Sequence, residues 1–215
     1  MNRSVSIVCL LVSACAASAQ QETAVSPVAA PAWQPITVVQ RVDWVAQSTV
    51  GPTSLVASAF AAGIDTWRDV PYEYGTHWDG FGQRFGLRLA DRALTTGIEA
   101  GAGSLWGEDP RYVRAPEKSF RGRVANVLRQ TVLAHNSSGG EIPAYARFIA
   151  VPSAAFLSNA WKPPSQSSIG DAADRIGFSF GNLVLANAYA EFWPDLKRRV
   201  FHHSTAAPYT DAAHR

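Results

Sequence analysis

The sequence predicts an all-α fold, a compact bundle of about five to seven helices packed through Gly/Ala-rich faces. Two observations support this. Apolar residues recur at helical spacing between stretches marked by Pro and Gly. Small residues also repeat four apart, as in Gly177 and Gly181 or Ala57 and Ala61, a spacing that lets helices approach closely.

The N-terminus, residues 1–19, predicts a secretory signal peptide. Arg3 precedes an apolar run, and Ala17-Ser18-Ala19 forms a cleavage site before Gln20. The mature protein is therefore expected outside the cytoplasm, in the periplasm or outer envelope. An alternative is a lipoprotein, because Val12-Ser13-Ala14-Cys15 loosely matches a cleavage box in which Cys15 would carry the lipid.

The amino-acid composition limits the kinds of chemistry that the mature protein can carry out. Cleavage after Ala19 removes Met1, Cys9 and Cys15, so the mature chain has no disulfide, thiol nucleophile or cysteine metal site. We expect no cofactor and no metal, since metalloprotease, esterase and nucleotide-binding motifs are absent from the sequence. Loss of Arg3 from a chain of net charge +2 leaves a nearly neutral protein, which does not suggest nucleic acid binding.

The ordered domain is expected at residues 36–202, between a disordered leader at 20–35 and a flexible tail at 203–215. Its first segment, 36–47, suits either a helix or a strand because of its β-branched residues. Pro52 then occupies the first position of a helix that runs to Trp67. After a loop, a long helix covers 82–106.

The second half continues in the same way. A helix over 119–135 should stop at the polar run 136–140. Pro143 opens the next helix, which Pro152 should kink or divide. After a Pro/Ser linker at 162–167, Ser168 begins a helix with a capping-box-like start.

Tryptophan followed closely by proline ends four of these apolar segments. The four residues are Trp67, Trp106, Trp161 and Trp193. Because proline stops a helix, the last long helix is expected to end at Trp193, with a short basic helix starting at Pro194. The indole N–H and apolar ring suit a helix end, and they also suit a membrane interface.

The helix at 82–106 has two contrasting faces when plotted at 100° per residue. A narrow packing face carries Gly86, Ala90, Ala93, Gly97 and Gly101, beside a bulky ridge of Leu87, Leu94, Ile98 and Leu105. We expect this face to lie against another helix. The far side, expected to face solvent, carries Arg84, Arg88, Arg92, Thr95 and Glu99.

Conventional membrane spans are not expected, because the uncharged segments are shorter than the ~20 residues a span needs or contain Gly-Pro and hydroxyl residues. Peripheral membrane contact remains open. Two basic clusters could meet anionic lipid, although solvated ends are the simpler interpretation. They comprise Arg111, Arg114, Lys118, Arg121 and Arg123, and then Lys197, Arg198, Arg199, His202 and His203.

The best candidate for a functional surface is the turn after the long helix. It joins charges, two aromatic rings and a rigid proline, through Trp106, Glu108, Asp109, Arg111 and Tyr112. Anchoring the following connection is its simpler role, with Glu108 and Asp109 pairing with Arg111 and Arg114.

Glu99 and Glu108 are also candidates for a catalytic general acid or base, because a buried Glu can have a raised pKa. The simpler interpretation of Glu99 is a pair with Arg92 or contact with solvent.

Four motifs resemble a family of uncharacterised exported bacterial proteins of acidobacterial type. They are Arg84-Phe85-Gly86, Glu108-Asp109-Pro110-Arg111-Tyr112, Ser158-Asn159-Ala160-Trp161 and Glu191-Phe192-Trp193-Pro194-Asp195. The resemblance covers about 51–201 and rests mainly on Glu-Asp-Pro-Arg-Tyr. It implies a bacterial envelope setting and implies nothing about mechanism.

Three functions follow as hypotheses. The first is an exported, non-enzymatic envelope protein that associates with a membrane or with itself, as the Gly/Ala faces and the Trp-ended helices favour. The second is a periplasmic carrier that holds an apolar small molecule between its helices. The third is a hydrolase that uses Glu99 or Glu108.

Overall fold

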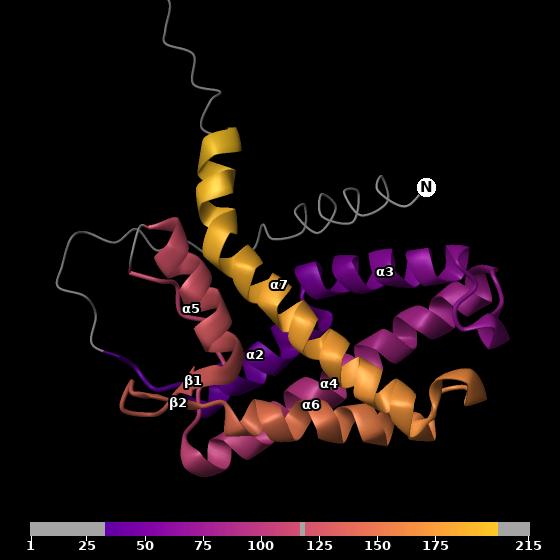
Figure 1. The fold of residues 1–215 in the computed structure, drawn as a ribbon, viewed down its shortest axis with the longest axis horizontal. Coiled ribbons are helices and arrows are strands. Elements are labelled where there is room, and N and C mark those ends of the chain that lie inside the picture. The colour runs from indigo at the N-terminus through magenta and orange to yellow at the C-terminus, as the bar shows by residue number, and fades with distance from the viewer. Residues whose placement is uncertain (1–32, 117–118, 202–215) are drawn as a thin grey trace, which may run out of the picture.

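The structure, a computed structural model, describes residues 33–116 and 119–201 (Figure 1). The expected signal peptide, Cys15, most of the leader and the tail lie outside the described residues. The fold is an all-α bundle with one small hairpin, as expected for the class. Its main elements are α2 (Val38–Val50), α3 (Pro52–Trp67), α4 (Trp78–Trp106), α5 (Phe120–Val132), β1 (Leu133–His135), β2 (Glu141–Pro143), α6 (Tyr145–Leu157) and α7 (Ile169–Phe201).

The first segment is a helix rather than a strand. Thr37 and Gln40 form a complete capping box at the start of α2, which outweighs the β-branched content of the helix. α2 lies along the C-terminal half of α4, where Arg41 donates to the Ala100 carbonyl at 3.4 Å and, just beyond the helix end, to the Glu108 carbonyl at 2.7 Å. α3 follows the N-terminal half, where Asp65 pairs with Arg88. Together α2 and α3 run alongside the whole of α4.

The long helix α4 starts at Trp78, four residues before the expected start, and ends as expected at Trp106. Gly107 follows with φ +73°, a left-handed conformation that suits glycine and ends the helix. A one-turn helix, η1 (Tyr72–Tyr74), precedes α4. The turn chosen from the sequence therefore begins directly at the end of α4.

The hairpin differs from the expected structure. α5 ends at Val132, and Leu133–His135 forms β1 instead of a last helical turn. β1 pairs antiparallel with β2, with Ala134 opposite Ile142. The Asn136 carboxamide oxygen accepts from the amides of Ser138 and Gly140, so a side chain expected only to stop a helix also shapes the turn between the strands.

Two of the three prolines, Pro143 and Pro194, behave differently from the expectation. Pro143 ends β2, and α6 begins two residues later at Tyr145. α6 runs past Pro152 without being divided. α7 runs past Pro194 to Phe201, so the expected end at Trp193 is wrong. Arg123 pairs with both Glu191 and Asp195, on either side of Pro194, and thereby holds the two turns together.

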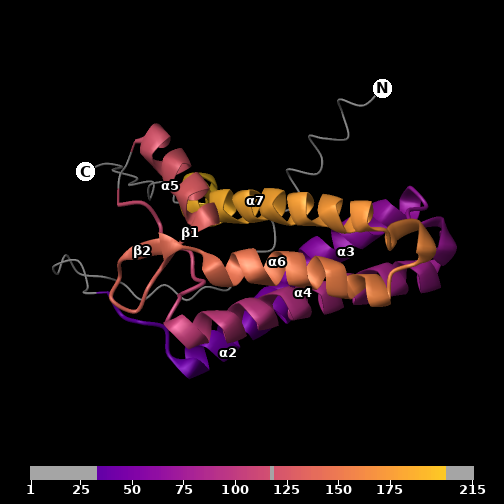
Figure 2. The same ribbon diagram turned by 60° about the horizontal axis from the view of Figure 1, so that its bottom comes forward.

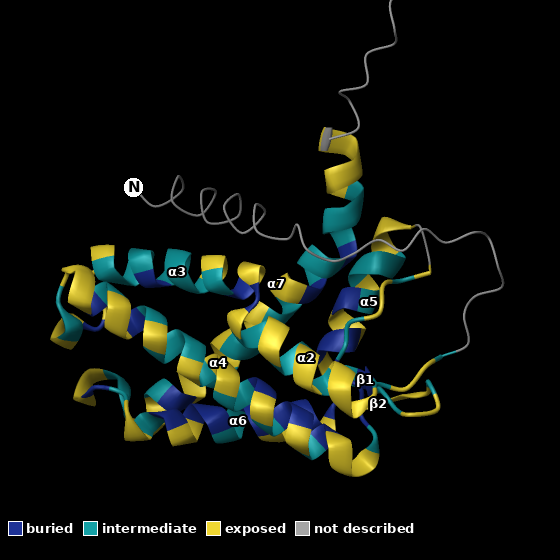
Figure 3. Cartoon of the chain, turned by 180° about the vertical axis from the view of Figure 1, so that it is seen from behind, coloured by how far each residue is buried: buried dark blue, intermediate teal, exposed yellow. Residues whose placement is uncertain are grey.

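The helices form layers in which α6 lies between α4 and α7 (Figure 2). The interior is built mainly from alanine. Buried residues gather on α6, whereas α2 and the neighbouring part of α4 are largely exposed (Figure 3). The buried alanines include Ala62, Ala100, Ala146, Ala150, Ala154, Ala155 and Ala172. The bundle is thus packed through small residues, as expected, but through those of α6 above all.

The orientation of α4 is opposite to the expected one. All five residues of the expected packing face, Gly86, Ala90, Ala93, Gly97 and Gly101, are exposed, and we call them the outer stripe. In the described chain, a Cβ added at any of its three glycines would meet no other atom within 4 Å. Gly103 instead approaches α6, where its added Cβ would lie 3.4 Å from that of Ala146.

The expected solvent face of α4 is largely turned inwards. Arg84 is buried and donates to three carbonyls of the preceding loop, those of Val70, Pro71 and Gly75. Glu99 is also buried, whereas Arg92 remains exposed. Hydrogen bonds to several acceptors compensate the cost of burying a guanidinium, and a Gly/Ala face has little apolar area to bury. These two facts explain the reversal.

No helix in the described ranges is long and apolar enough to cross a membrane.

Candidate functional site

Three carboxylates are almost completely buried at the end of the bundle that carries the hairpin. The exposed fraction is 1% for Glu108, 2% for Asp109 and 0% for Glu191. Burial of a charge is costly unless partners satisfy it. The hydrogen-bond partners of these three carboxylates therefore show which elements the site holds together.

Glu108 joins α4 to α6. One carboxylate oxygen accepts from the Ala146 amide at 3.0 Å, in the first turn of α6, and from the Trp106 indole at 2.9 Å. The Ala144 side chain provides no cap for that helix, so Glu108 supplies the negative charge that a helix N-terminus favours. Its second oxygen has no hydrogen-bond partner among the described residues.

Asp109 fixes the turn to the hairpin. Its carboxylate accepts from Arg111 Nε at 3.0 Å and from a terminal nitrogen of the same guanidinium at 2.7 Å. Its amide donates to the His135 carbonyl at 2.8 Å, which extends the hairpin as an isolated bridge. The expected pair of Asp109 with Arg111 is present. The expected use of Arg114 is wrong, because Arg114 pairs with Asp195 on α7 instead.

Glu191 joins α5 to α7. Its carboxylate accepts from Arg123 Nε at 2.7 Å, from the Tyr112 hydroxyl at 2.7 Å and from the Ala115 amide at 3.0 Å. Burial alone would raise the pKa of Glu191, but these hydrogen bonds hold it below its usual value. Burial, together with the Glu191 carboxylate, raises the pKa of Tyr112.

Sequence patterns do not single out Glu191 or Arg123 as site residues. Glu191 lies in an apolar helix that also contains Tyr189 and Trp193, and an acidic residue in such a setting is a signal of a buried pair. From the sequence, Arg123 is only one member of a basic cluster. The structure shows that this guanidinium is a partner for a buried acid.

Glu99 pairs with Arg147 on α6, not with Arg92. The Arg147 Nε donates to the carboxylate at 3.0 Å, and the same guanidinium donates to the carbonyls of Gln130 and Thr131 at the end of α5. Burial raises the pKa of Glu99, and the Arg147 charge opposes that rise. This pair joins α4, α5 and α6.

The turn at 106–112, which the sequence singles out as a functional surface, is thus a junction that contacts every main helix except α3. Glu99 and Glu108 come near each other, but neither lines either of the two hollows described next. The hydrogen bonds of Glu99 and Glu108 account for the burial of the two carboxylates and do not by themselves indicate catalysis. Among the residues that the structure describes, no group of three or more His, Cys, Asp or Glu side chains could hold a metal ion.

The first hollow is an apolar groove of about 620 Å³ between α2 and α4, which we call the α2–α4 groove. Val38, Val42 and Val45 form one wall, and the outer stripe provides Ala93 and Gly101 on the other. The Val38 side chain is 79% exposed, and Leu105 nearby on α4 is 81% exposed. Large contiguous apolar patches are the surfaces at which soluble proteins most often meet partners, ligands or membranes.

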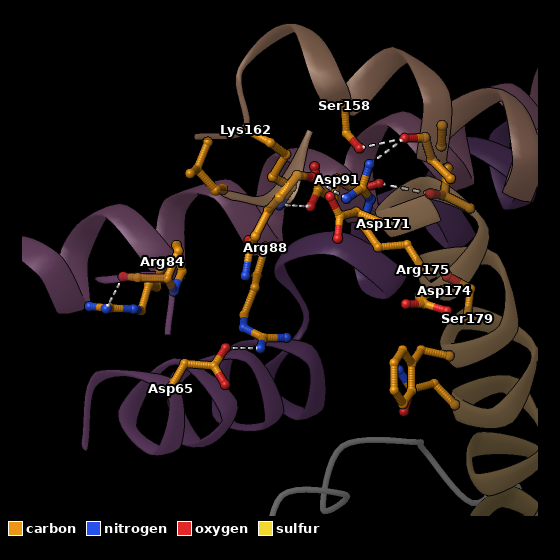
Figure 4. Close-up of a pocket in the computed structure, with 18 of the residues that line it drawn as sticks. Asp65, Arg84, Arg88, Asp91, Ser158, Lys162, Asp171, Asp174, Arg175 and Ser179 are labelled. Atoms are coloured by element: carbon orange, nitrogen blue, oxygen red, sulfur yellow. Dashed lines mark hydrogen bonds and ion pairs between the residues drawn. The ribbon is translucent and has the colours of Figure 1, made fainter. Parts of the chain in front are cut away.

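The second hollow is a polar cleft of about 640 Å³, which we call the cleft. α3 and α4 form one wall, α6 the floor and α7 the other wall. Figure 4 shows Arg88 reaching from α4 to Asp65 on α3, while Asp174 and Ser179 lie across from them on α7. The cleft and the α2–α4 groove use different faces of α4.

Comparison of the chain with family models, with curated proteins and with solved structures finds no match.

Proposed function

We propose that this protein is an exported, non-enzymatic component of the bacterial envelope that assembles with a second copy of itself through α2 and α4. The observation that carries this proposal is the reversed orientation of α4, which leaves the outer stripe exposed beside an apolar groove. The signal-peptide pattern in the sequence supports the location.

The glycines of the outer stripe favour contact with another helix. A glycine inside a helix costs about 0.5–1 kcal/mol relative to alanine. Gly86, Gly97 and Gly101 bear this cost although, within the described chain, a Cβ added at each would meet no atom within 4 Å. Close approach of another backbone offsets the cost, because small residues let helix axes come near each other.

The lack of charge favours a second copy as the partner. In a two-fold contact the same patch meets itself, so a charged group at its centre would lie near its own copy. The residues of the outer stripe carry no charge. Beside them, Leu87 and Leu94 are half-buried and Leu105 is exposed, so a ridge on one copy can enter the stripe of the other.

A membrane surface fits this face less well. Helices that lie in a membrane interface carry bulky apolar residues on one side and Lys or Arg on the other. The exposed valines of α2 are accompanied by the exposed acid Asp43, and Arg41 is the only base of that helix. The Arg41 guanidinium is committed to the Glu108 carbonyl.

The test is the oligomeric state of the mature protein, measured by sedimentation equilibrium. We expect a dimer that Gly101→Leu converts to a monomer, because an added Cβ at this position meets no atom of the isolated chain, whereas a bulky side chain blocks close approach of a second helix. Gly177→Leu is the matched control, since Gly177 is also an exposed helical glycine with free space in the described chain but lies on α7. It should leave the dimer intact.

A wild-type protein that is monomeric at every concentration would contradict self-assembly. Flotation of that monomer with anionic vesicles would then favour the membrane instead.

The α2–α4 groove also favours a second candidate, a carrier of an apolar small molecule. Its volume lies within the range of about 300–1,000 Å³ that is typical of ligand sites, and valines and alanines make up most of its lining. Native mass spectrometry of the protein purified from its host tests this candidate. A bound lipid-sized mass that Val42→Asp removes would support it, and a bare protein mass would contradict it.

A further inference from the structure

The cleft is a built feature of the fold with defined walls and a closed end. Lys162 and the Trp161 indole both reach Asp91 on α4, at 2.6 and 3.1 Å. Further along, Ser165 donates to Glu73 through its amide and its hydroxyl. These contacts fasten the segment between α6 and α7 to α4 and η1, so the cleft is bounded where the chain turns.

The charges of the cleft cancel. Its lining carries as many carboxylates as cations, those of Asp65, Asp91, Asp171 and Asp174 against Arg84, Arg88, Lys162 and Arg175. Most of these cations are already engaged: Arg88 pairs with Asp65, Lys162 pairs with Asp91, and Arg84 is held by loop carbonyls. An anionic ligand would meet the carboxylates and a cationic ligand would meet the guanidinium groups.

The α7 wall offers hydrogen-bonding groups that the fold leaves open. Asp174, Ser179 and Asn182 line the cleft, and no hydrogen bond of their side chains to another described residue is present. Arg175, by contrast, is held by the Gln166 and Ala155 carbonyls and the Asn159 side-chain oxygen, so the donors open to a ligand are the Ser179 hydroxyl and the Asn182 amide. Together these groups offer both donors and acceptors.

An aromatic ring lies beside these polar groups. Phe178 is on the same wall and is 74% exposed, and Tyr74 lines the cleft from η1. An exposed ring next to open donors and acceptors suits a ligand that has one apolar face and many hydroxyls. An apolar ligand would leave the polar groups without partners, which is costly.

We propose that the cleft binds a neutral polyhydroxylated ligand, a saccharide. Each sugar hydroxyl both donates and accepts, which matches a lining rich in both kinds of group and without net charge. The cleft volume of about 640 Å³ is in the range of small-molecule sites. This proposal does not depend on self-assembly, because the α2–α4 groove and the cleft lie on different faces of α4.

The test is binding of the mature protein to an array of neutral and charged glycans, followed by titration calorimetry with the neutral glycan that binds best. We expect Asn182→Ala and Phe178→Ala each to weaken binding by about tenfold, a loss that corresponds to one good contact. Both residues are exposed, so neither substitution should unfold the protein. Ser104→Ala in the α2–α4 groove is the control and should bind as the wild type does.

Salt provides a second readout. Binding of a neutral ligand should change little with added NaCl, whereas binding of a charged ligand should weaken, because ~0.1 M salt screens exposed charges beyond about 10 Å. The proposal is overturned if no neutral glycan binds, if charged glycans bind more tightly, or if the Asn182 and Phe178 variants bind as well as the Ser104 variant.

Discussion

Buried charged residues in this protein take partners from distant parts of the chain. Arg147 pairs with Glu99 across 48 residues, and Arg123 pairs with Glu191 across 68. From the sequence alone, only residues on the same helix face or close together in the chain can be related to one another, and Glu99 is therefore expected to pair with Arg92. The pair of Asp109 and Arg111 is expected correctly, because those residues are two positions apart.

The Glu191 pair gives a prediction with a defined pH dependence. Glu191→Gln should lower the free energy of unfolding at neutral pH by about 1.5–3 kcal/mol, the contribution of hydrogen bonds to a charged group, because Arg123 loses its buried partner and keeps only Asp195. The pKa of Glu191 is depressed in the folded protein, so its stabilisation exists above the unfolded pKa and is lost as the pH falls through the folded value. The difference between variant and wild type should therefore shrink in acid.

Urea unfolding at several pH values measures this difference. Glu141→Gln is the control, because its pair with Arg129 lies at the surface and should contribute no more than about 1 kcal/mol. A Glu191→Gln effect that is equally large in acid would contradict the role assigned to the ionised carboxylate.

The Arg147 guanidinium gives a second prediction at this scale. Arg147→Met should cost about 3–5 kcal/mol of stability, because Glu99 keeps its burial and loses its counter-charge. Adding Glu99→Gln should recover part of the loss, and a double-mutant cycle by urea unfolding measures the coupling. Additive losses would show that the two side chains do not act as a pair.

At the scale of elements, sequence patterns locate helices better than they orient them. Pro52 and Trp67 bound α3 as expected, because the signals for helix ends are local. The two faces of α4 are separated correctly by the pattern but assigned to the wrong environments. Which face of α4 is buried depends on where Arg84 finds its hydrogen-bond acceptors. These acceptors are carbonyls of the loop before α4, and the sequence does not specify the path of that loop.

Exposed helical glycines, one on α7 and one in the outer stripe of α4, give a prediction for helix stability. Gly177→Ala should raise the free energy of unfolding by about 0.5–1 kcal/mol, because an exposed helical glycine loses backbone freedom that alanine does not. Gly97→Ala should raise it by the same amount in the monomer and by less in the dimer, where another helix covers the site. Urea unfolding at low and high protein concentration measures both. Equal gains at both concentrations would contradict a covered stripe.

At the scale of the whole molecule, the all-α class follows from helical periodicity, but the arrangement of layers does not. The hairpin escapes sequence reasoning because Leu133–His135 continues the helical pattern of α5, and only pairing with Glu141–Pro143 makes it a strand. Export by cleavage after Ala19, with a lipid on Cys15 as the alternative, remains a prediction from residues outside the described ranges, and the envelope location remains a prediction as well.

Self-assembly predicts a thermal behaviour of the whole protein. The melting temperature of the wild type should rise with protein concentration, because association stabilises only the folded chain. That of Gly101→Leu should not depend on concentration. Differential scanning calorimetry over a wide concentration range measures both, and a wild-type melting temperature that stays constant would contradict a dimer.

The alanine interior reverses the usual relation between a core and its mutations. In most proteins the harmful changes make large side chains small and leave cavities. Here Ala146 and Ala150 have almost nothing to lose, and at 1% and 0% exposure a larger side chain at either position would have to displace its neighbours. A scan that replaces each residue by alanine would pass over this core unchanged, whereas a scan with valine or leucine would find it at once.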